Sequence, residues 1–428
     1  MTDLHKIVII GGGAGGLELA TQLGNSLGKN RKAEITLVDQ KLTHIWKPLL
    51  HEIAAGTLNP HAEETNYFAH AAQHHYQFIL GRFIDLDSHN KQVILEVSTL
   101  SKQNPTQKQF YVDYDTLIIA VGSTSNDFNT PGVKEHCHFL DNRAQADIFQ
   151  QDLLHLYLAA QNHGSSRKLN IAIIGAGATG IELAAELAQA KQSFFKYGLN
   201  KIEPKNVNIT VIEAAERILP ALSENIAQHT HQQLQKFGIN ILTGHRVAQV
   251  DDEKVYFADG TSIDAELKVW AAGIKAPTVL EKLTGFEKDN ILRLKVYATL
   301  QTISDPHVFA FGDCAHCQPA ADEPVLAPRA QVASQQASFL VDAMKARIQG
   351  KPQPMFKFSD KGSLVSLSQH KAVGELLGQF NVQGFAAKAM YVSLYRLHQA
   401  TIHGYAHAGL LTAKDFVTRK VGPKIKLH

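Results

Sequence analysis

Apolar residues occur along this chain in short runs that alternate with helical patterns, which predicts an α/β fold. Two runs open nearly identical stretches, Ile7–Ala20 (IVIIGGGAGGLELA) and Ile171–Ala184 (IAIIGAGATGIELA). In each stretch the uninterrupted apolar run predicts a strand buried on both faces of a parallel sheet, and the residues after the glycines predict a helix. The duplication therefore indicates two α/β units of the same kind.

Glycines follow the spacing G-x-G-x-x-G in both copies, and the chemistry of a pyrophosphate requires them. The first allows a tight turn, the second lets phosphate approach bare backbone, and the third lets helix and strand pack closely. They are Gly11, Gly13 and Gly16, then Gly175, Gly177 and Gly180. Each copy is followed by a strand ending in an acid, Asp39 or Glu213, which is placed to accept a ribose hydroxyl. We therefore expect two Rossmann-like dinucleotide sites.

The two acids also indicate which dinucleotides bind. The charge of Asp39 disfavours a 2′-phosphate, so the first site suits the adenosine end of FAD; a strand-end turn residue is the alternative. Glu213 likewise favours the free 2′-hydroxyl of NADH over NADPH, although Arg217 lies close by in sequence. The other expected FAD contacts around the first loop are Gly12, Ala14, Gly15 and Gln40.

The segment His44–Gly56 (HIWKPLLHEIAAG) contains no cysteine. Disulfide reductases with two dinucleotide sites carry a Cys-x-x-x-x-Cys pair in this neighbourhood, so electrons here do not leave through a dithiol. Pro48 predicts a fixed turn, and Lys47 could contact the flavin or its phosphates, with a solvated loop lysine as the alternative.

Further strands lead into glycines that would let the backbone approach a ligand. Tyr114–Gly122 provides Ala120 and Gly122, and Leu267–Gly273 provides Ala272 and Gly273 in the second half. Alternation over 76–95 predicts a β-hairpin with a turn at Ser88–Asn90, and 141–160 predicts a helix linking the halves. Glu182 and Glu186 lie one turn apart after Gly180; exposed carboxylates are one interpretation, but Glu182 is also near where a nicotinamide would lie.

The strand 307–313 ends in Gly312 and Asp313, a pair that meets FAD in flavoproteins with two dinucleotide domains, so the chain returns to the first domain. Cys314, His316 and Cys317 follow it. They offer fewer than the four ligands of a closed zinc site, so we expect small core or loop residues and no metal, with metal or redox use as the alternative.

Composition sets the broad class. The 428 residues fit two or three domains, and a net charge of +2 gives no reason to expect nucleic-acid binding. No secretory signal or apolar run long enough to span a bilayer is evident. Three cysteines fit a reducing compartment.

The segment 328–339 predicts a helix on which Gln331 and Gln335 share a face that could line a ligand pocket, with a solvated helix face as the alternative. After this helix the pattern of residues differs from that of the two α/β units. A linker at 351–354 precedes strands predicted at 356–367 and 372–377, and from Ala386 the pattern becomes helical. The tail from Lys388 carries seven Lys or Arg against one acid. Such a basic amphipathic segment fits a helix lying on an anionic membrane, and packing on the protein itself or on a second subunit is the alternative. Its residues predicted to lie on one side are Met390, Tyr391, Leu394, Tyr395, Leu397 and His398.

Taken in order, GGGAGGLELA, HIWKPLLHEIAAG, LIIAVGS, GAGATGIELAAEL, VIEAAERILP, VWAAGI, FAFGDCA, PRAQVASQQ and DKGSLVSLS resemble the type II NADH dehydrogenases, with a tail similar to the proteobacterial branch. The resemblance covers nearly the whole chain. It implies non-covalent FAD, NADH as donor, a membrane quinone as acceptor, no proton pumping, and a peripheral position on the cytoplasmic face of the inner membrane.

The resemblance also implies roles for residues. It places Ala330 and Gln331 near the flavin and quinone, Glu182 at the nicotinamide, Gly312 and Asp313 at FAD, and Lys388 as a C-terminal basic residue over the flavin. Glu182 and Gln331 are the expected catalytic residues.

We expect an FAD domain at 1–140 and 290–350, an NADH domain at 165–285 and a membrane-associating region at 351–428. A sulfide:quinone oxidoreductase-like flavoprotein and an NAD(H)-sensing flavin-binding protein are the alternatives. The quinone and the formation of a homodimer are left open.

Overall fold

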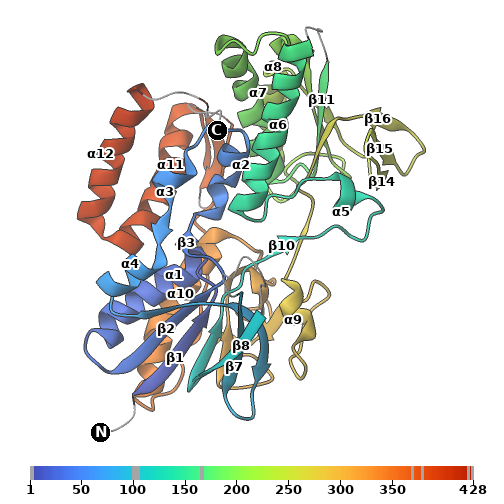
Figure 1. Ribbon diagram of the computed structural model, residues 1–428. Coiled ribbons are helices and arrows are strands. Elements are labelled where there is room, and N and C mark those ends of the chain that lie inside the picture. Colours follow the sequence, from blue (N-terminus) through green and yellow to red (C-terminus); the bar gives the residue numbers. More distant parts are fainter. Residues whose placement is uncertain are drawn as a thin grey trace.

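The computed structural model describes residues 4–98, 107–163, 168–367, 371–376, 380–421 and 425. Two units, each built on a parallel sheet, lie one above the other, and two C-terminal helices run along one side (Figure 1). The expected α/β class with two Rossmann-like units is confirmed.

The lower unit contains a five-stranded parallel sheet in the order β20-β9-β1-β2-β5. Residues from these strands, from α1 and α10, and from the antiparallel sheet β6-β7-β8 share one apolar core. The bounds are β1 (His5–Ile10), α1 (Ala14–Leu23), a π-helical turn (Gly24–Gly28), β2 (Ala33–Asp39), β5 (Gln77–Leu80), β6 (Arg82–Asp87), β7 (Gln92–Ser98), β8 (Gln107–Asp113), β9 (Thr116–Ile119), β20 (Val308–Ala310) and α10 (Ala330–Ile348). The predicted hairpin is β6-β7, whereas β5 joins the main sheet.

The upper unit repeats this plan with the parallel sheet β13-β12-β11-β17. Its core includes residues of α6, α7 and α8, and a small antiparallel sheet, β14-β15-β16, extends from it. The bounds are α6 (Arg143–His163), β11 (Leu169–Ile174), α7 (Ala178–Lys196), a 3-10 turn (Pro204–Asn206), β12 (Val207–Ile212), α8 (Glu224–Lys236), β13 (Ile239–Leu242), β14 (Val247–Val250), β15 (Lys254–Phe257), β16 (Ser262–Asp264) and β17 (Leu267–Trp270).

Two antiparallel segments connect the units, because β10 (Thr124–Ser125) pairs with β18 (Ile274–Lys275). After β18 the chain returns to the lower core, where Ala276 and Leu280 are fully buried. The remaining bounds on these paths are β3 (Thr43–His44), a 3-10 turn (Lys47–Leu49), α2 (Leu50–Ala54), α3 (Pro60–Glu63), β4 (Thr65–Asn66), α4 (Tyr67–Gln73), α5 (Val133–His136), α9 (Thr278–Lys282), β19 (Leu294–Val296), a 3-10 turn (Gly312–Cys314) and β21 (Ala315–Cys317).

The C-terminal region forms a small antiparallel sheet followed by a helical hairpin. Its elements are β22 (Ser363–Ser366), β23 (Ala372–Leu376), β24 (Phe380–Gln383), α11 (Gly384–His403) and α12 (Tyr405–Val421). The strand predicted from residue 356 is wrong at its start, because 356–362 has no strand structure and is held instead by side chains of α10. In the part of the chain that the structure describes, no helix combines the length and apolarity needed to cross a bilayer.

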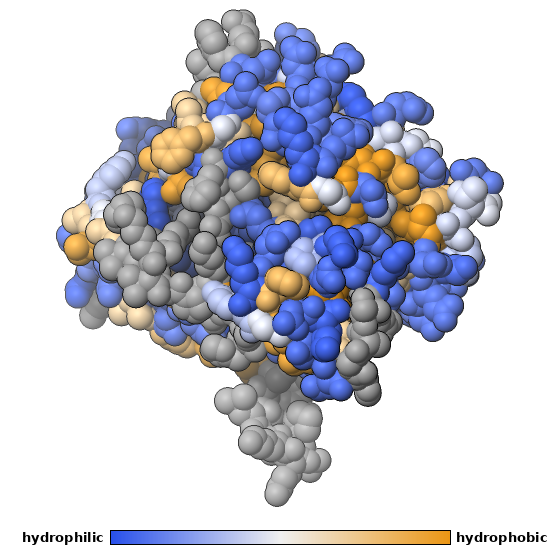
Figure 2. All heavy atoms as spheres, turned by 90° about the horizontal axis from the view of Figure 1, so that it is seen from above, coloured by the Kyte–Doolittle hydropathy of each residue, from blue (hydrophilic) through white to orange (hydrophobic). Residues whose placement is uncertain are grey.

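The prediction of one common side for Met390, Tyr391, Leu394, Tyr395, Leu397 and His398 is wrong. Tyr391 and His398 face the protein and are buried, whereas Leu394 and Leu397 are 44% and 55% exposed. One face of α11 packs against α1 of the lower unit and against β23, and the opposite face is exposed. Figure 2 shows the molecule from above, where hydrophilic residues dominate and apolar ones lie in separate groups among them.

Candidate functional site

The first glycine loop joins β1 to α1 at the carboxyl edge of the lower sheet, where β1 lies next to β9 and the strand order reverses. Ligands of open α/β sheets bind at such a point. A Cβ on Gly11 would lie 2.4 Å from the Ala120 carbonyl oxygen, and one on Gly16 would lie 1.9 Å from the Gly11 carbonyl oxygen. A Cβ on Gly13 would meet no protein atom within 4 Å. The loop is thus closed on the protein side and open where a pyrophosphate would lie.

The second glycine loop has the same geometry between β11 and α7. A Cβ on Gly175 would lie 2.7 Å from backbone atoms of the Ala271–Ala272 segment, and one on Gly180 would lie 2.0 Å from the Gly175 carbonyl oxygen. Gly177, like Gly13, faces open space. The repeat seen in the sequence is therefore a repeat of two similar binding loops.

Each predicted acid accepts a hydrogen bond from its own glycine loop. The Gly12 amide donates to Asp39 Oδ2 at 2.7 Å, and the Ala176 amide donates to Glu213 Oε2 at 2.8 Å. Burial raises the pKa of Asp39, and hydrogen bonds from the backbone amides of Gly12, Lys41 and Gln40 lower it in part. Both carboxylates are thus held at the edge of a loop, where a ribose would lie. Gln40 is exposed beside Asp39.

Arg217 does not extend toward Glu213. Its guanidinium donates to the carbonyl oxygens of Leu219 and Pro220, at 3.2 and 3.0 Å. Because these bonds hold the cation away from the acid, the geometry agrees with a site for a free 2′-hydroxyl.

A third group of expected FAD residues gathers at the ends of β9 and β20. Ser123 Oγ donates to Asp313 Oδ2 at 2.9 Å, and Lys47 Nζ donates to the Ser123 carbonyl oxygen at 3.0 Å. Gly122 has a φ of +70°, and a Cβ there would meet no atom within 4 Å. The structure thus brings Lys47, Gly122 and Asp313 together, with Pro48 in the 3-10 turn after Lys47. In the upper unit, a Cβ on Gly273 would lie 2.4 Å from the Phe128 ring.

Gln331 and Gln335 do share a face of α10, as predicted, but in this structure they hold a protein segment. Gln331 Nε2 donates to Asp360 Oδ1 and to the Gly362 carbonyl oxygen, and Gln335 Nε2 donates to the Ser359 carbonyl oxygen. Ala330 begins the same helix, whose early turn packs near Gly312 through Ala333. The predicted roles of Ala330 and Gln331 toward flavin and quinone remain predictions.

Glu182 and Lys388 are far apart in sequence, but both form hydrogen bonds with Ser366, the last residue of β22. Glu182 Oε1 accepts the Ser366 amide at 2.9 Å, and Lys388 Nζ donates to Ser366 Oγ at 2.7 Å. Both side chains are buried, and burial raises the pKa of Glu182. The interpretation of Glu182 as an exposed helical carboxylate is therefore wrong.

Near Glu182 lie Glu186, to which the sequence assigned no role, and three residues that it did not single out, His51, Glu52 and Thr57. Burial, together with the nearby charge of Glu52, raises the pKa of Glu186 to about 7. Thr57 Oγ1 donates to Glu186 Oε2 at 3.0 Å, and His51 Nδ1 lies 3.5 Å from Glu182 Oε2. The only sign of them in the sequence was the adjacent pair of titratable residues, His51 and Glu52, in the segment that lacks the cysteines of disulfide reductases.

The cysteines are buried or half-buried free thiols. Burial raises the pKa of Cys137 and Cys314 to about 12 and that of Cys317 to about 11. His316 Nδ1 faces Asp289 Oδ2 at 3.0 Å. In the described ranges, the side chains close enough to share a metal ion are instead those of His51, Glu52 and Glu186.

Comparison with known proteins agrees with this geometry. The family model described as pyridine nucleotide-disulphide oxidoreductase matches residues 5–337. The chain is 40% identical to a type II NADH:quinone oxidoreductase of Haemophilus influenzae, over 99% of this chain and 100% of that protein. It is 29% identical to a protein of the same name from Staphylococcus aureus, over 88% of this chain and 91% of the relative.

Among solved structures, NDH2 from Plasmodium falciparum in complex with NADH is similar, with a TM-score of 0.84. That likeness covers 99% of this chain and 100% of the other at 21% identity, and it concerns the fold.

Proposed function

The chain belongs to the pyridine nucleotide-disulphide oxidoreductase family and, within it, to the type II NADH:quinone oxidoreductases, and on this premise we propose that it carries two electrons from NADH to a membrane quinone by way of FAD. The observation that carries the proposal is the pair of open glycine loops, each with its own acid, on one chain. The proposed reaction converts NADH, a proton and quinone into NAD⁺ and quinol, and pumps no proton.

The residues of the lower unit fit FAD. Gly13 leaves space for a pyrophosphate at the start of α1, and Asp39 is held where an adenosine ribose would meet it. Lys47, Gly122 and Asp313 line the next part of the same sheet edge. When bound, FAD supplies the redox chemistry, because it takes a hydride from NADH and gives two electrons to quinone.

The upper unit orients NADH. Gly177 leaves space for its pyrophosphate, and Glu213 accepts a ribose hydroxyl while Arg217 is held elsewhere. Glu182, fixed by the Ser366 amide and facing His51, orients the nicotinamide and holds a proton at its carboxyl group for the quinone step. Lys388, held by Ser366 Oγ, supplies a positive charge beside that carboxyl group.

Membrane association belongs to this group of enzymes, and we assign it here to the outward face of the C-terminal helices. Leu394 and Leu397 of α11 are exposed, and Tyr405 and Leu410 of α12 are 82% and 70% exposed. Apolar side chains beside basic ones suit a helix lying in a lipid interface. We place the protein on the cytoplasmic face of the inner membrane, where NADH is made, and leave the homodimer as a prediction.

The decisive experiment uses the purified flavoprotein and a short-chain quinone. We expect steady-state NADH oxidation that depends on quinone, with kcat/KM for NADH at least about tenfold above that for NADPH, since Glu213 disfavours a 2′-phosphate. Turnover too slow to measure would favour the NAD(H)-sensing alternative.

Thiol alkylation distinguishes the proposed function from the sulfide:quinone oxidoreductase-like alternative. Because the cysteines are buried or half-buried and their pKa values are raised, alkylation should leave NADH oxidation unchanged. Loss of turnover in step with thiol modification would favour the sulfide:quinone oxidoreductase-like alternative, which needs reactive cysteines.

A further inference from the structure

A compact group of three ligand-type side chains lies between α2 and α7. A ring nitrogen of His51 and one carboxylate oxygen each of Glu52 and Glu186 lie within 4.8 Å of one another. His51 and Glu186 are 2% and 3% exposed, whereas Glu52 is partly exposed. No motif in the sequence indicates this group, because Glu186 is far along the chain from His51 and Glu52.

The imidazole of His51 has one ring nitrogen to spare. Its Nδ1 faces Glu182 Oε2 at 3.5 Å, while its Nε2 is buried and has no hydrogen-bond partner among the described residues. A metal-binding histidine usually directs its other ring nitrogen to a carboxylate, which fixes the tautomer. Glu182 stands in that place, so the lone pair of Nε2 is available to a cation.

The charge of this region is unbalanced. The charge of Glu52 acts on Glu186, all three carboxylates (Glu52, Glu182 and Glu186) act on Tyr391, and Lys388 acts on Glu182 and Glu186. The three carboxylates and Lys388 therefore carry a net charge of −2 when ionised. Buried carboxylates without enough positive charge destabilise a fold unless a proton or a metal ion compensates them. A divalent cation balances the deficit.

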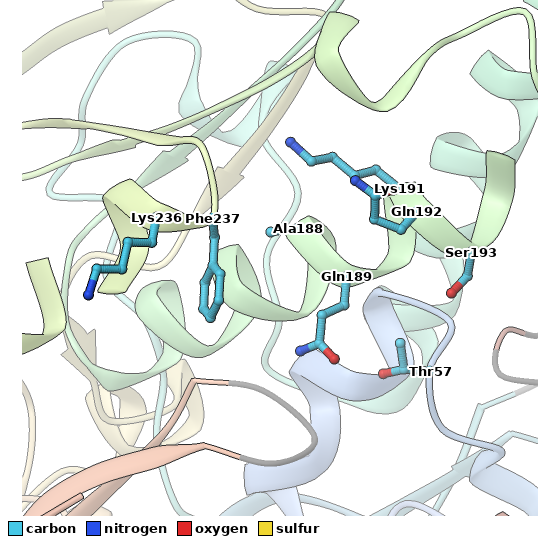
Figure 3. A pocket seen from close by; sticks show the side chains of 8 residues that line it. All are labelled: Thr57, Ala188, Gln189, Lys191, Gln192, Ser193, Lys236 and Phe237. Carbon is cyan, nitrogen blue, oxygen red and sulfur yellow. The ribbon is translucent and has the colours of Figure 1, made fainter. Parts of the chain in front are cut away.

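The group reaches the surface at Glu52, which is partly exposed. A pocket of about 390 Å³ lies nearby along α7 and includes Thr57, whose hydroxyl donates to Glu186 Oε2. Figure 3 shows Gln189 of α7 and Thr57 beside each other at this pocket. Thr57 therefore marks the boundary between the pocket and the buried carboxylates.

We propose that His51, Glu52 and Glu186 form a binding site for a divalent transition-metal cation of the Zn²⁺ type. One imidazole with two carboxylates suits zinc better than Mg²⁺ or Ca²⁺, which prefer oxygen ligands alone. Ligand atoms of a tetrahedral zinc site lie roughly 3.4 Å apart. Because the three groups here lie within 4.8 Å of one another, their side chains must close by up to about 1.4 Å. Three protein ligands leave a position for water.

The test uses the full-length flavoprotein, stripped with a chelator and titrated with Zn²⁺ by calorimetry in the absence of NADH and quinone. We expect one site per chain, and Glu186→Gln and Glu52→Gln should each weaken binding at least about tenfold. Mg²⁺ should not compete. His74→Gln, at a histidine outside the group, should leave this site unchanged.

Binding of equal strength in wild type and in both glutamine variants would overturn the site, as would the absence of a stoichiometric site. If Glu186→Gln fails to fold, Glu52→Gln decides, because Glu52 is partly exposed and its flavin content and melting temperature report folding. The inference stands apart from the proposed electron transfer, since metal binding is measured without either substrate.

Discussion

The imidazole rings of His44 and His398 are in contact, with their Nε2 atoms 3.1 Å apart, although 354 residues separate them in sequence. The other ring nitrogen of His44 lies 2.9 Å from the Gly12 carbonyl oxygen, and that of His398 lies 2.7 Å from Glu18 Oε1. All of these side chains are buried. A continuous line of contacts therefore joins the first glycine loop to helix α11.

Replacing His398 should loosen the C-terminal helices. His398→Leu leaves Glu18 buried without its partner, and an unpaired buried polar or charged group costs about 1–3 kcal/mol or more. We expect faster amide exchange along α11 and a lower melting temperature. Leu397→Ala is the control, because Leu397 is exposed and should change neither measurement. Equal exchange in the two variants would show that the histidine pair does not hold the helix.

Two buried histidines, His44 and His70, make the free energy of unfolding depend on pH. Burial lowers the pKa of His44 and of His70 to about 3. Because each pKa is about 6.5 in the unfolded chain, both contribute stability above that pH and lose it as the pH falls from 6.5 toward 3. At pH 5.5 the loss is roughly 1 kcal/mol for each histidine.

Chemical denaturation at several pH values measures this loss. We expect His70→Gln to flatten the dependence between pH 7.5 and 5.5, while His89→Gln, at an exposed histidine, keeps the wild-type slope. A slope that His70→Gln does not change would contradict the assignment.

Substitutions in the glycine loops should separate the glycines that folding requires from those that dinucleotide binding requires. Gly16→Ala would place a Cβ 1.9 Å from the Gly11 carbonyl oxygen, so this variant should not fold. Gly13 has φ −62° and open space, so Gly13→Ala should fold but lose FAD. Gly177→Ala should keep FAD and raise KM for NADH by about tenfold or more. Visible flavin absorbance and circular dichroism distinguish the three; a yellow, active Gly13→Ala protein would exclude this loop as the FAD site.

Glu182→Gln should lower kcat for NADH:quinone turnover by about 10²-fold or more, because the amide cannot carry a proton between its neighbours. Flavin content should be unchanged, since Glu182 belongs to the upper unit. Glu281→Gln, at an exposed acid on α9, is the control. Full turnover in the Glu182 variant with both substrates would remove it from the mechanism.

Local rules were enough to predict the framework. The strand β1, the glycine loop after it and the acid at the end of β2 all follow from short-range patterns, because buried parallel strands and phosphate turns restrict residue types strongly. The second copy confirmed the first, and both loops have the expected geometry.

The surroundings of Glu182 could not be predicted in the same way. Ser366, Lys388 and His51 reach it from three distant segments, and no periodicity connects them. The residue pattern predicted the helix α11 but not which of its residues are buried, because contacts with other parts of the chain bury Tyr391 and His398. Tertiary packing, rather than local preference, decides these positions.

The exposed face of α11 makes the last prediction. Leu394 and Leu397 are 44% and 55% exposed, so burying the two together in lipid is worth roughly 1.5–3 kcal/mol. Leu394→Glu with Leu397→Glu should therefore lower the fraction that sediments with anionic vesicles by at least about tenfold, while short-chain quinone reduction is kept. Ile148→Glu, at an exposed apolar residue of α6, should sediment like wild type. Unchanged sedimentation of the double variant would mean that another surface meets the membrane.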